Sequence, residues 1–276
     1  MDRLSAYRDE IAWYLKRPRL YPEFLRTLKS KLLRAEPAPD TRRQATEWCA
    51  AQALDKFQAI LQITGRTHEE SLVVKFAPVF LSARQKAAAC PVRLGGAANL
   101  DLLYWIAEHL QARTVIETGV ALGWSSLAML LSLSNRPGSL LASTDMPCRG
   151  LDADSRLLSS EGYVGCVVPD HLKNYWRIYP FAYREGLPMA LNTFSNPDMC
   201  HYDSDKSYAG RSWAYPKLWD ALRAGGYLIS DDIGDNLALR DFCIHVNQTP
   251  IIVVMPADPL NPSPDERKYV SLLCKC

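Results

Sequence analysis

No stretch of the sequence approaches the roughly 20 consecutive apolar residues that a membrane-spanning helix requires. Histidine is scarce, at five in 276 residues, and the five histidines lack metal-ligand spacing, which argues against metal binding by histidine. The eight cysteines form no C-x-x-C pair, so we expect buried free thiols and neither a disulfide framework nor a zinc site. The first residues are charged and amphipathic, unlike a signal peptide. Together these absences predict a cytoplasmic protein without a transmembrane segment.

Several catalytic motifs are also absent. The chain has no P-loop, no G-x-S-x-G nucleophile elbow and no motif of the N/D-P-P-Y type. These absences disfavour NTPases, hydrolases and enzymes that methylate the amino groups of nucleobases. A net charge of +2 neither favours nor disfavours nucleic acid, and without a supporting motif we predict no nucleic-acid partner.

What the sequence does contain is ordinary for a globular protein, with 48% hydrophobic and 22% charged residues. It divides near residue 90. Before that point, helical periodicity predicts helices at residues 4–15, 21–33 and 41–64, with a linker over 34–39. The prediction is an N-terminal helical extension or cap at residues 1–90, followed by a single domain at 91–276.

Apolar strands alternate with helical segments in residues 91–276, which predicts an α/β fold whose mostly parallel sheet is covered by helices on both faces. We expect strands at residues 115–117, 139–144, 176–179, 199–202, 227–230, 251–255 and 268–274, and helices at 100–110, 126–134 and 216–222. Ligands of such sheets bind at the carboxyl ends of the strands. Those ends are therefore the place to look for a site.

The N-terminal segment is basic. Residues 1–43 carry eleven Lys and Arg residues against six Asp and Glu residues. Such a segment fits an anionic lipid or an acidic partner. A solvated helix face, or a cap over the active site, explains the same pattern, and we favour this second interpretation. The helices also leave open a homo-oligomer.

Residues 115–125 combine a buried strand, a turn with two glycines and the start of a helix. A dinucleotide site has G-x-G-x-x-G so that a pyrophosphate lies against the helix. Here the order is Glu117-x-Gly119-x-x-x-Gly123, and the carboxylate would repel a pyrophosphate but suits a cofactor with an ammonium and a sulfonium. The spacing resembles that of class I methyltransferases dependent on S-adenosylmethionine (SAM). An ordinary strand-to-helix turn is the alternative.

Acidic residues follow four of the predicted strands. Asp145 comes 28 residues after Glu117, where a carboxylate accepts both ribose hydroxyls of a nucleotide. Trp124 packs either near the cofactor or in the core, and the sequence leaves both open. The predicted cofactor-binding set is Glu117, Gly119, Gly123, Trp124, Ser125, Asp145 and Asp203.

Three further carboxylates end the fourth and fifth strands. If these strands are neighbours, Asp203, Asp231 and Asp232 converge at strand ends about 5 Å apart. Carboxylates that close repel one another, and a divalent cation removes the conflict. An all-oxygen set suits Mg²⁺, with Mn²⁺ or Ca²⁺ as alternatives. Without a metal, Asp231 would cap the next turn, Asp232 would face solvent and Asp203 would hold only the cofactor.

Residues 95–276 resemble class I SAM-dependent methyltransferases of the macrocin-type, antibiotic-sugar O-methyltransferase group. The resemblance rests on residues 117–125, 203–208 and 225–232. It implies a Rossmann-like class I sheet, and a divalent cation held by Asp203, Asp231 and Asp232. It also implies a catalytic base. In the antibiotic-sugar enzymes the corresponding residue would be Asp205, and in the catechol-type enzymes it would be Lys206. Many relatives have histidine at the position of Lys206, and this chain departs from them there.

The predicted function is SAM-dependent, metal-assisted O-methyl transfer to a hydroxyl of a vicinal diol in a sugar, phenol or secondary metabolite. The partner is then a small-molecule or saccharide acceptor. Two other classes stay open: a non-catalytic SAM-binding scaffold, and a nicotinamide oxidoreductase with Asp145 on the ribose. Lys206 also has two non-catalytic interpretations, as a surface lysine or as an ion-pair partner of Asp205.

Overall fold

The structure is a computed structural model that describes residues 11–33, 39–67, 70–91, 94–146, 149–151, 157–159, 162–256, 260 and 267–276. Its centre is a seven-stranded sheet in the order β5-β2-β1-β6-β7-β9-β8. The strands are β1 (Thr114–Thr118), β2 (Leu140–Thr144), β5 (Trp176–Tyr179), β6 (Met199–Tyr202), β7 (Tyr227–Ser230), β8 (Ile251–Pro256) and β9 (Arg267–Cys274). Six of these strands run in one direction, and β9 runs in the opposite direction between β7 and β8. The predicted α/β fold with a mostly parallel sheet is confirmed.

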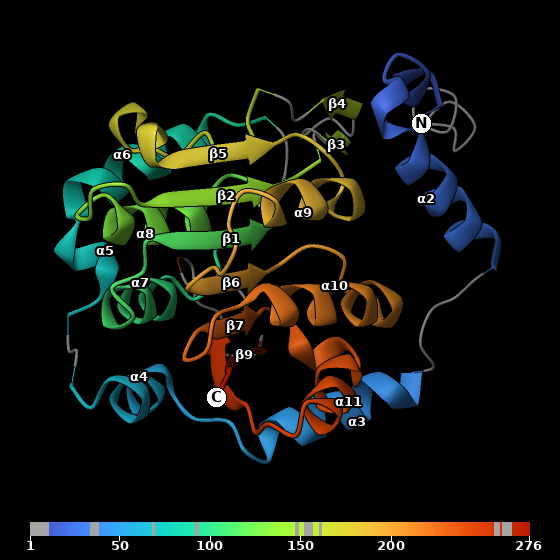
Figure 1. The fold of residues 1–276 in the computed structure, drawn as a ribbon. Coiled ribbons are helices and arrows are strands. Elements are labelled where there is room, and N and C mark those ends of the chain that lie inside the picture. The colour runs from blue at the N-terminus through green and yellow to red at the C-terminus, as the bar shows by residue number, and fades with distance from the viewer. Residues whose placement is uncertain are drawn as a thin grey trace.

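Alternate residues of the strands supply two separate cores, as the two-residue period of a strand requires. Val115 and Leu141 belong to one core, while Ile116 and Ala142 belong to the other. Helices on both faces cover these cores (Figure 1). The first face holds α6 (Ala77–Ala88), α7 (Leu100–His109) and α8 (Trp124–Leu133), and the second holds α9 (Tyr183–Leu191), α10 (Tyr208–Ala221) and α11 (Ala238–His245).

The N-terminal helices are present, but the predicted helix over 41–64 is wrong. Two helices, α3 (Pro39–Ala50) and α4 (Lys56–Thr64), stand in its place. Between them Leu54 adopts a β-bridge with Val253 of the edge strand β8, exchanging hydrogen bonds of 2.8 and 3.0 Å with Ile252 and Val254. Asp55 then caps α4 through a capping box with Gln58. A helix cannot continue through a residue whose backbone groups pair with a strand.

This break carries the chain across the edge of the sheet from one face to the other. Cys49 of α3 is buried in the second core, whereas Ile60 of α4, Leu72 of α5 (Leu72–Lys75) and Phe80 of α6 are buried in the first. Residues 39–90 therefore complete both cores. The helix α2 (Tyr21–Leu33) matches its predicted range and packs in a small cluster of its own with Trp13, Tyr14 and Leu20.

Other elements differ from the prediction. The helix α10 begins at Tyr208 and not at 216, because Ser207 caps it by accepting a 3.0 Å hydrogen bond from the Gly210 amide. The helices α9 and α11 and the hairpin of β3 (Arg149–Leu151) and β4 (Leu157–Ser159) have no counterpart in the prediction. Residues 4–10 of the first predicted helix, most of the linker and Cys148 lie outside the described residues.

Two predicted absences can be compared with the structure. No helix in the described ranges is both long and apolar enough to cross a membrane. Seven cysteines have described positions, and all seven are free thiols. Burial raises the pKa of the Cys49 and Cys243 thiols to about 12, so both are uncharged near neutral pH.

Asp198 holds the amino ends of the central strands together, at the edge of the sheet away from the strand carboxyl ends. Its Oδ2 accepts hydrogen bonds from the Arg113 amide (2.8 Å) and from the amide and hydroxyl of Thr114 (2.9 and 3.0 Å), and its Oδ1 accepts one from Arg223 Nε (2.6 Å). Burial acts to raise the pKa of Asp198, but these donors outweigh it and hold the pKa below its usual value.

We expect Asp198→Ala to lower the free energy of unfolding by about 2 kcal/mol near neutral pH, because it leaves several donors unpaired. A carboxylate whose pKa is depressed in the folded state stabilises above its unfolded pKa, and the benefit is lost as the pH falls through the folded pKa. Urea denaturation should therefore show the difference between variant and parent narrowing below about pH 4. A difference that is unchanged at acid pH would contradict this role.

Candidate active site

A cavity of about 520 Å³ opens at the carboxyl ends of the parallel strands. It is continuous from the glycine turn after β1, through the end of β2, to the ends of β6 and β7. Its walls include every predicted site residue except Glu117 and Gly123. The predicted residues at the cavity are Gly119, Trp124, Ser125, Asp145, Asp203, Asp205, Lys206, Asp231 and Asp232.

The glycine turn is shaped by close backbone contacts. Gly119 has φ +86°, and its amide donates a 2.9 Å hydrogen bond to the carbonyl of Thr144 at the end of β2. A Cβ at this position would lie 2.1 Å from the carbonyl oxygen of Asp203. Gly123 also has positive φ, and its Cβ would lie 2.8 Å from the Cα of Gly165. Both positions therefore require glycine.

We expect Gly119→Ala to weaken cofactor binding at least tenfold and to destabilise the fold by about 1–3 kcal/mol, because backbone strain adds to a clash with Asp203. Gly138→Ala is the matched control, since Gly138 has φ +76° but nothing within 4 Å of its added Cβ. Isothermal titration with SAM and thermal unfolding would measure both effects. Equal SAM affinity in the two variants would contradict the role given to the turn.

Asp145 lies at the end of β2 and supports the same turn. Its Oδ2 accepts hydrogen bonds from the amides of Val120 (2.9 Å) and Ala121 (2.7 Å). Burial raises the pKa of Asp145, and these two amides offset part of the effect. Asp145 also lines the cavity, and the contact with ribose hydroxyls stays a prediction.

Glu117 lies beneath the turn and away from the cavity. Its side chain is fully buried. The carboxylate accepts hydrogen bonds of 2.6 Å from the hydroxyls of Ser125, Ser126 and Ser143. These three hydroxyls satisfy a buried charge that would otherwise be costly. Glu117 therefore ties the start of α8 to β1 and β2, and any effect on a cofactor is through Ser125 and the turn.

Trp124 opens α8 and serves two purposes. Its indole is buried and stacks on Phe80 of α6, with ring planes 4° apart and centroids 6.2 Å apart. The same residue also contributes to the cavity wall. The two interpretations left open by the sequence are thus compatible, because a core residue at the start of α8 borders the cavity.

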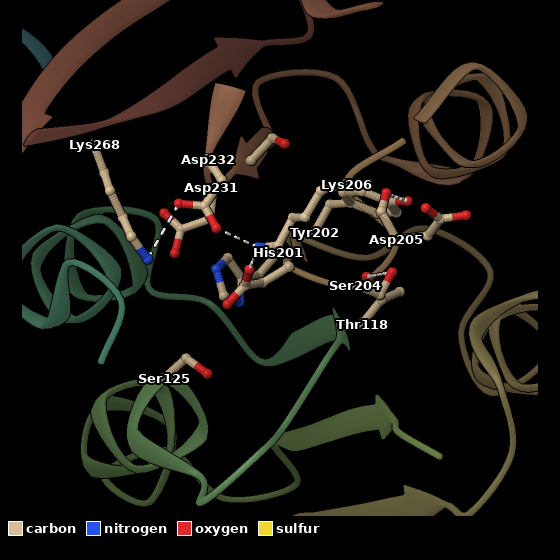
Figure 2. Close-up of polar contacts among 12 residues, drawn as sticks. Thr118, Ser125, His201, Tyr202, Ser204, Asp205, Lys206, Asp231, Asp232 and Lys268 are labelled. Carbon is tan, nitrogen blue, oxygen red and sulfur yellow. Dashed lines mark hydrogen bonds and ion pairs between the residues drawn. The ribbon is translucent and has the colours of Figure 1, made fainter. Parts of the chain in front are cut away.

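The acid cluster, which consists of Asp203, Asp231 and Asp232, forms where β6 and β7 end side by side. The register pairs Tyr202 with Ser230, so the residues that follow them are adjacent. The amide of Asp203 donates to Thr118 (2.8 Å) and that of Asp231 to Tyr202 (3.1 Å). This geometry brings together at the cavity the three carboxylates that the sequence grouped. Figure 2 shows two of them, Asp231 and Asp232, side by side.

Two lysines balance part of this negative charge. Lys206 Nζ contacts Asp203 and lies 2.8 Å from Asp232 Oδ2, while Lys268 Nζ of β9 lies 3.2 Å from Asp232 Oδ1 (Figure 2). Burial acts to raise the pKa of Asp232, but the two ammonium groups bring it below its usual value. Burial raises the pKa of Asp231, which has no ammonium within ion-pair distance in the described part of the chain. Lys206 is therefore an ion-pair partner of Asp203 and Asp232, and not of Asp205.

The turn that carries Asp231 and Asp232 is held from below by a buried arginine. Asp232 has φ +53°, a left-handed conformation that costs energy for a residue with a side chain. Arg211 of α10 is fully buried and donates through Nη2 to the carbonyls of Asp231 (3.1 Å) and Asp232 (2.7 Å). This contact fixes the strained turn, so that both carboxylates remain at the cavity.

Asp205 lies at the start of α10, where both of its oxygens are engaged. Oδ1 accepts a 2.9 Å hydrogen bond from the Ser207 amide, and Oδ2 accepts a 2.8 Å hydrogen bond from the Tyr183 hydroxyl. Burial, followed by the charge of Asp205, raises the pKa of that tyrosine. Asp205 therefore fixes the loop before α10 and orients Tyr183 at the cavity wall.

Sequence reasoning missed several residues of the site. His201 is buried, and one of its ring nitrogens lies within 4.8 Å of carboxylate oxygens of both Asp203 and Asp231. Its spacing of two residues from Asp203 along β6 was the available signal, because such residues share a face of a strand. Lys268 and Glu23 come from β9 and α2, far away in the sequence, and no local pattern points to them.

The sequence of residues 116–233 matches a family model described as a methyltransferase domain. This range contains the glycine turn, Asp145 and the acid cluster. A comparison with curated proteins finds no match for the chain.

The chain is also similar to solved structures. An O-methyltransferase from Bacillus cereus in complex with SAH has 12% identity and a TM-score of 0.55, over 82% of this chain and 100% of that one. Cofactor-bound Rv0187 from MTB has 13% identity and a TM-score of 0.55, over 74% and 93%. The O-methyltransferase TomG from Streptomyces achromogenes, in complex with SAM and involved in tomaymycin synthesis, has 14% identity and a TM-score of 0.50, over 79% and 96%. These likenesses, each under 25% identical, establish the shared fold. The family match over residues 116–233 supports the prediction of a SAM-dependent methyltransferase.

Proposed function

We propose that the chain transfers a methyl group from SAM to a hydroxyl oxygen, assisted by a divalent cation, and that the acceptor is a vicinal diol in a sugar, phenol or secondary metabolite. One observation carries the proposal: a single cavity joins the glycine turn and Asp145 to the acid cluster. The cofactor site and the reacting centre of such an enzyme must adjoin in this way. Within the methyltransferases, we place the chain near the macrocin-type group, on the sequence Asp203-x-Asp205.

The donor set fits a divalent cation. Single atoms of His201, Asp203 and Asp231 lie within 4.8 Å of one another, and Asp232 adds a carboxylate beside them. Nδ1 of His201 lies 3.6 Å from Glu117 Oε1 and makes no hydrogen bond with the described residues, so it does not itself point to a bound cation. Oxygen donors favour Mg²⁺, and an imidazole extends the choice to Mn²⁺. A bound cation would supply a Lewis acid that lowers the pKa of an acceptor hydroxyl, and a vicinal diol offers it two oxygens.

The chain itself orients the reactants and removes the proton. The glycine turn and Asp145 hold the cofactor, and Asp145 accepts from the ribose hydroxyls. Of the two candidate bases, the geometry favours Lys206, because Asp205 already accepts from Ser207 and Tyr183. Lys206 enters the cavity beside Asp203. An ammonium group has no acceptor, so Lys206 would take the hydroxyl proton as a neutral amine, after it has released its own proton to solvent.

The charge of the cavity restricts the acceptor. Its walls carry six carboxylates against the ammonium groups of two lysines. These are Glu23, Asp145, Asp203, Asp205, Asp231 and Asp232 against Lys206 and Lys268. An anionic acceptor would be repelled, so we propose a neutral or cationic one. We also propose a cytoplasmic location, which has support from the free thiols of the described cysteines.

The proposal is tested by incubating the protein with SAM and Mg²⁺ and a panel of acceptors, followed by mass spectrometry. Catechol, dopamine and a neutral vicinal-diol sugar are compared with phenol, in which the second hydroxyl is missing. We expect a methylated product from a diol and at least tenfold less from phenol. If the protein binds SAM but methylates none of these diols, whichever divalent cation is added, the result would favour the non-catalytic scaffold.

A further inference from the structure

The N-terminal helical segment presents an apolar surface that the fold does not use. Ile11, Leu15, Tyr21, Leu25 and Leu28 are all exposed and are called the outer face below. They make up five of the twelve exposed large hydrophobic side chains in the described part of the chain. Tyr21, Leu25 and Leu28 follow i, i+4, i+7 spacing, so they form one stripe along α2.

The opposite face of the same segment is fully engaged. Trp13, Tyr14 and Leu20 are buried together, and Phe24 and Met146 pack against them. Arg26 binds both carboxylate oxygens of Glu185 on α9, at 2.7 and 2.5 Å. These contacts fix α2 beside the cavity without any help from the outer face. The outer face is therefore not an unfilled part of the hydrophobic core.

The charge of the segment indicates which kind of surface the outer face binds. Residues 11–33 contain six Lys and Arg residues and one acid, Glu23. Glu23 does not offset the outer charge, because it pairs with Arg26 and lines the cavity. Lys16, Arg19 and Lys29 are exposed beside the apolar stripe. Apolar side chains flanked by Lys and Arg are the pattern of helices that lie in the surface of anionic membranes.

We propose that the outer face binds an anionic lipid surface and holds the protein there peripherally. A second copy of the chain is a poorer occupant, because a two-fold contact through this face would set its basic residues against the same residues of the partner. Figure 1 places α2 beyond the strand arrowheads, at the edge of the sheet where the cavity opens. The inference is independent of the reaction catalysed.

The test is sedimentation of the full chain with vesicles of phosphatidylcholine alone and of phosphatidylcholine with about 30% phosphatidylserine. We expect binding to the anionic vesicles only, and at least a tenfold loss of affinity in high salt. Leu25→Ser with Leu28→Ser should weaken binding at least tenfold. The matched control is Val74→Ser with Leu81→Ser, which changes two apolar side chains on α5 and α6 that are at least as exposed as Leu25 and Leu28.

Three results would overturn the proposal. The first is no binding to anionic vesicles at low salt, and the second is equal loss of binding in the two double variants. The third is a dimer, measured by light scattering, that the Leu25→Ser, Leu28→Ser variant converts to a monomer, since the outer face would then be covered by a second copy. SAM titration of each variant confirms that the fold is intact, because the substituted side chains lie outside the cavity.

Discussion

Replacing Lys206 by methionine is expected to lower the rate of methyl transfer by about 10²–10⁴-fold, the range for loss of a general base. The ammonium group of Lys206 contacts Asp203 and Asp232 at the end of the cavity. Methionine keeps the aliphatic stem and removes the nitrogen that, as a neutral amine, would accept the proton. SAM affinity should change little, because the glycine turn and Asp145 do not contact Lys206. Single-turnover kinetics with SAM and a diol would separate the two effects.

Two variants make this result specific. Lys217→Met removes the same group from an exposed position on α10, outside the cavity, and should leave the rate unchanged. Asp205→Asn removes the rival base and should cost less than tenfold in rate, since Asp205 mainly fixes the loop through Ser207 and Tyr183. A large loss in Asp205→Asn beside a small loss in Lys206→Met would reverse the assignment.

Asp231→Asn is expected to lower methyl transfer at least about 10²-fold, with SAM affinity nearly unchanged. Even the residues that support metal ligands cost 10–100-fold when replaced, and a ligand itself should cost more. Asp231 lies within 4.8 Å of donor atoms of His201 and Asp203. The variant should fold well, because asparagine removes a buried charge that has no ammonium partner among the described residues. Asp235→Asn, which changes an acid on the turn outside the cavity, is the control.

The same experiment includes removal of the cation. Chelation should abolish transfer by the parent protein, and added Mg²⁺ or Mn²⁺ should restore it. Asp231→Asn should need a higher cation concentration for the activity that remains. Transfer that survives chelation would show that Lys206 and Lys268 balance the acid cluster without a metal, and would refute the cation part of the proposal.

The sequence predicts the sheet well because its strands are short apolar runs that end in acids. The ranges of β5, β6 and β7 match their predictions, and the pairing of β6 with β7 follows from the parallel arrangement. The convergence of Asp203, Asp231 and Asp232 could be predicted for the same reason. Local pattern and tertiary contact agree in this part of the chain.

The remaining features depend on contacts that no local pattern records. The break at Leu54 arises from pairing with β8, about 200 residues later, which overrides a continuous helical periodicity. Glu117 is predicted from the sequence as a cofactor contact. In the structure its carboxylate lies beneath the turn, where it accepts hydrogen bonds from three serines of α8 and β2. Lys268 reaches the acid cluster only because β9 inserts beside β7. The break at Leu54 and the position of Lys268 come from residues far apart in the sequence, whereas Ser125 and Ser126 follow Glu117 by only eight and nine residues.

The most direct test is isothermal titration of SAM into the purified protein, with Mg²⁺ and again with chelator. We predict a single SAM site with a micromolar dissociation constant, which corresponds to a binding free energy of about −8 kcal/mol. The affinity for SAM should be at least tenfold weaker in Gly119→Ala. An additional heat on titration with Mg²⁺ would support a cation at the acid cluster. Absence of SAM binding under both conditions would contradict the assignment of the cavity as a cofactor site, and with it the proposed reaction.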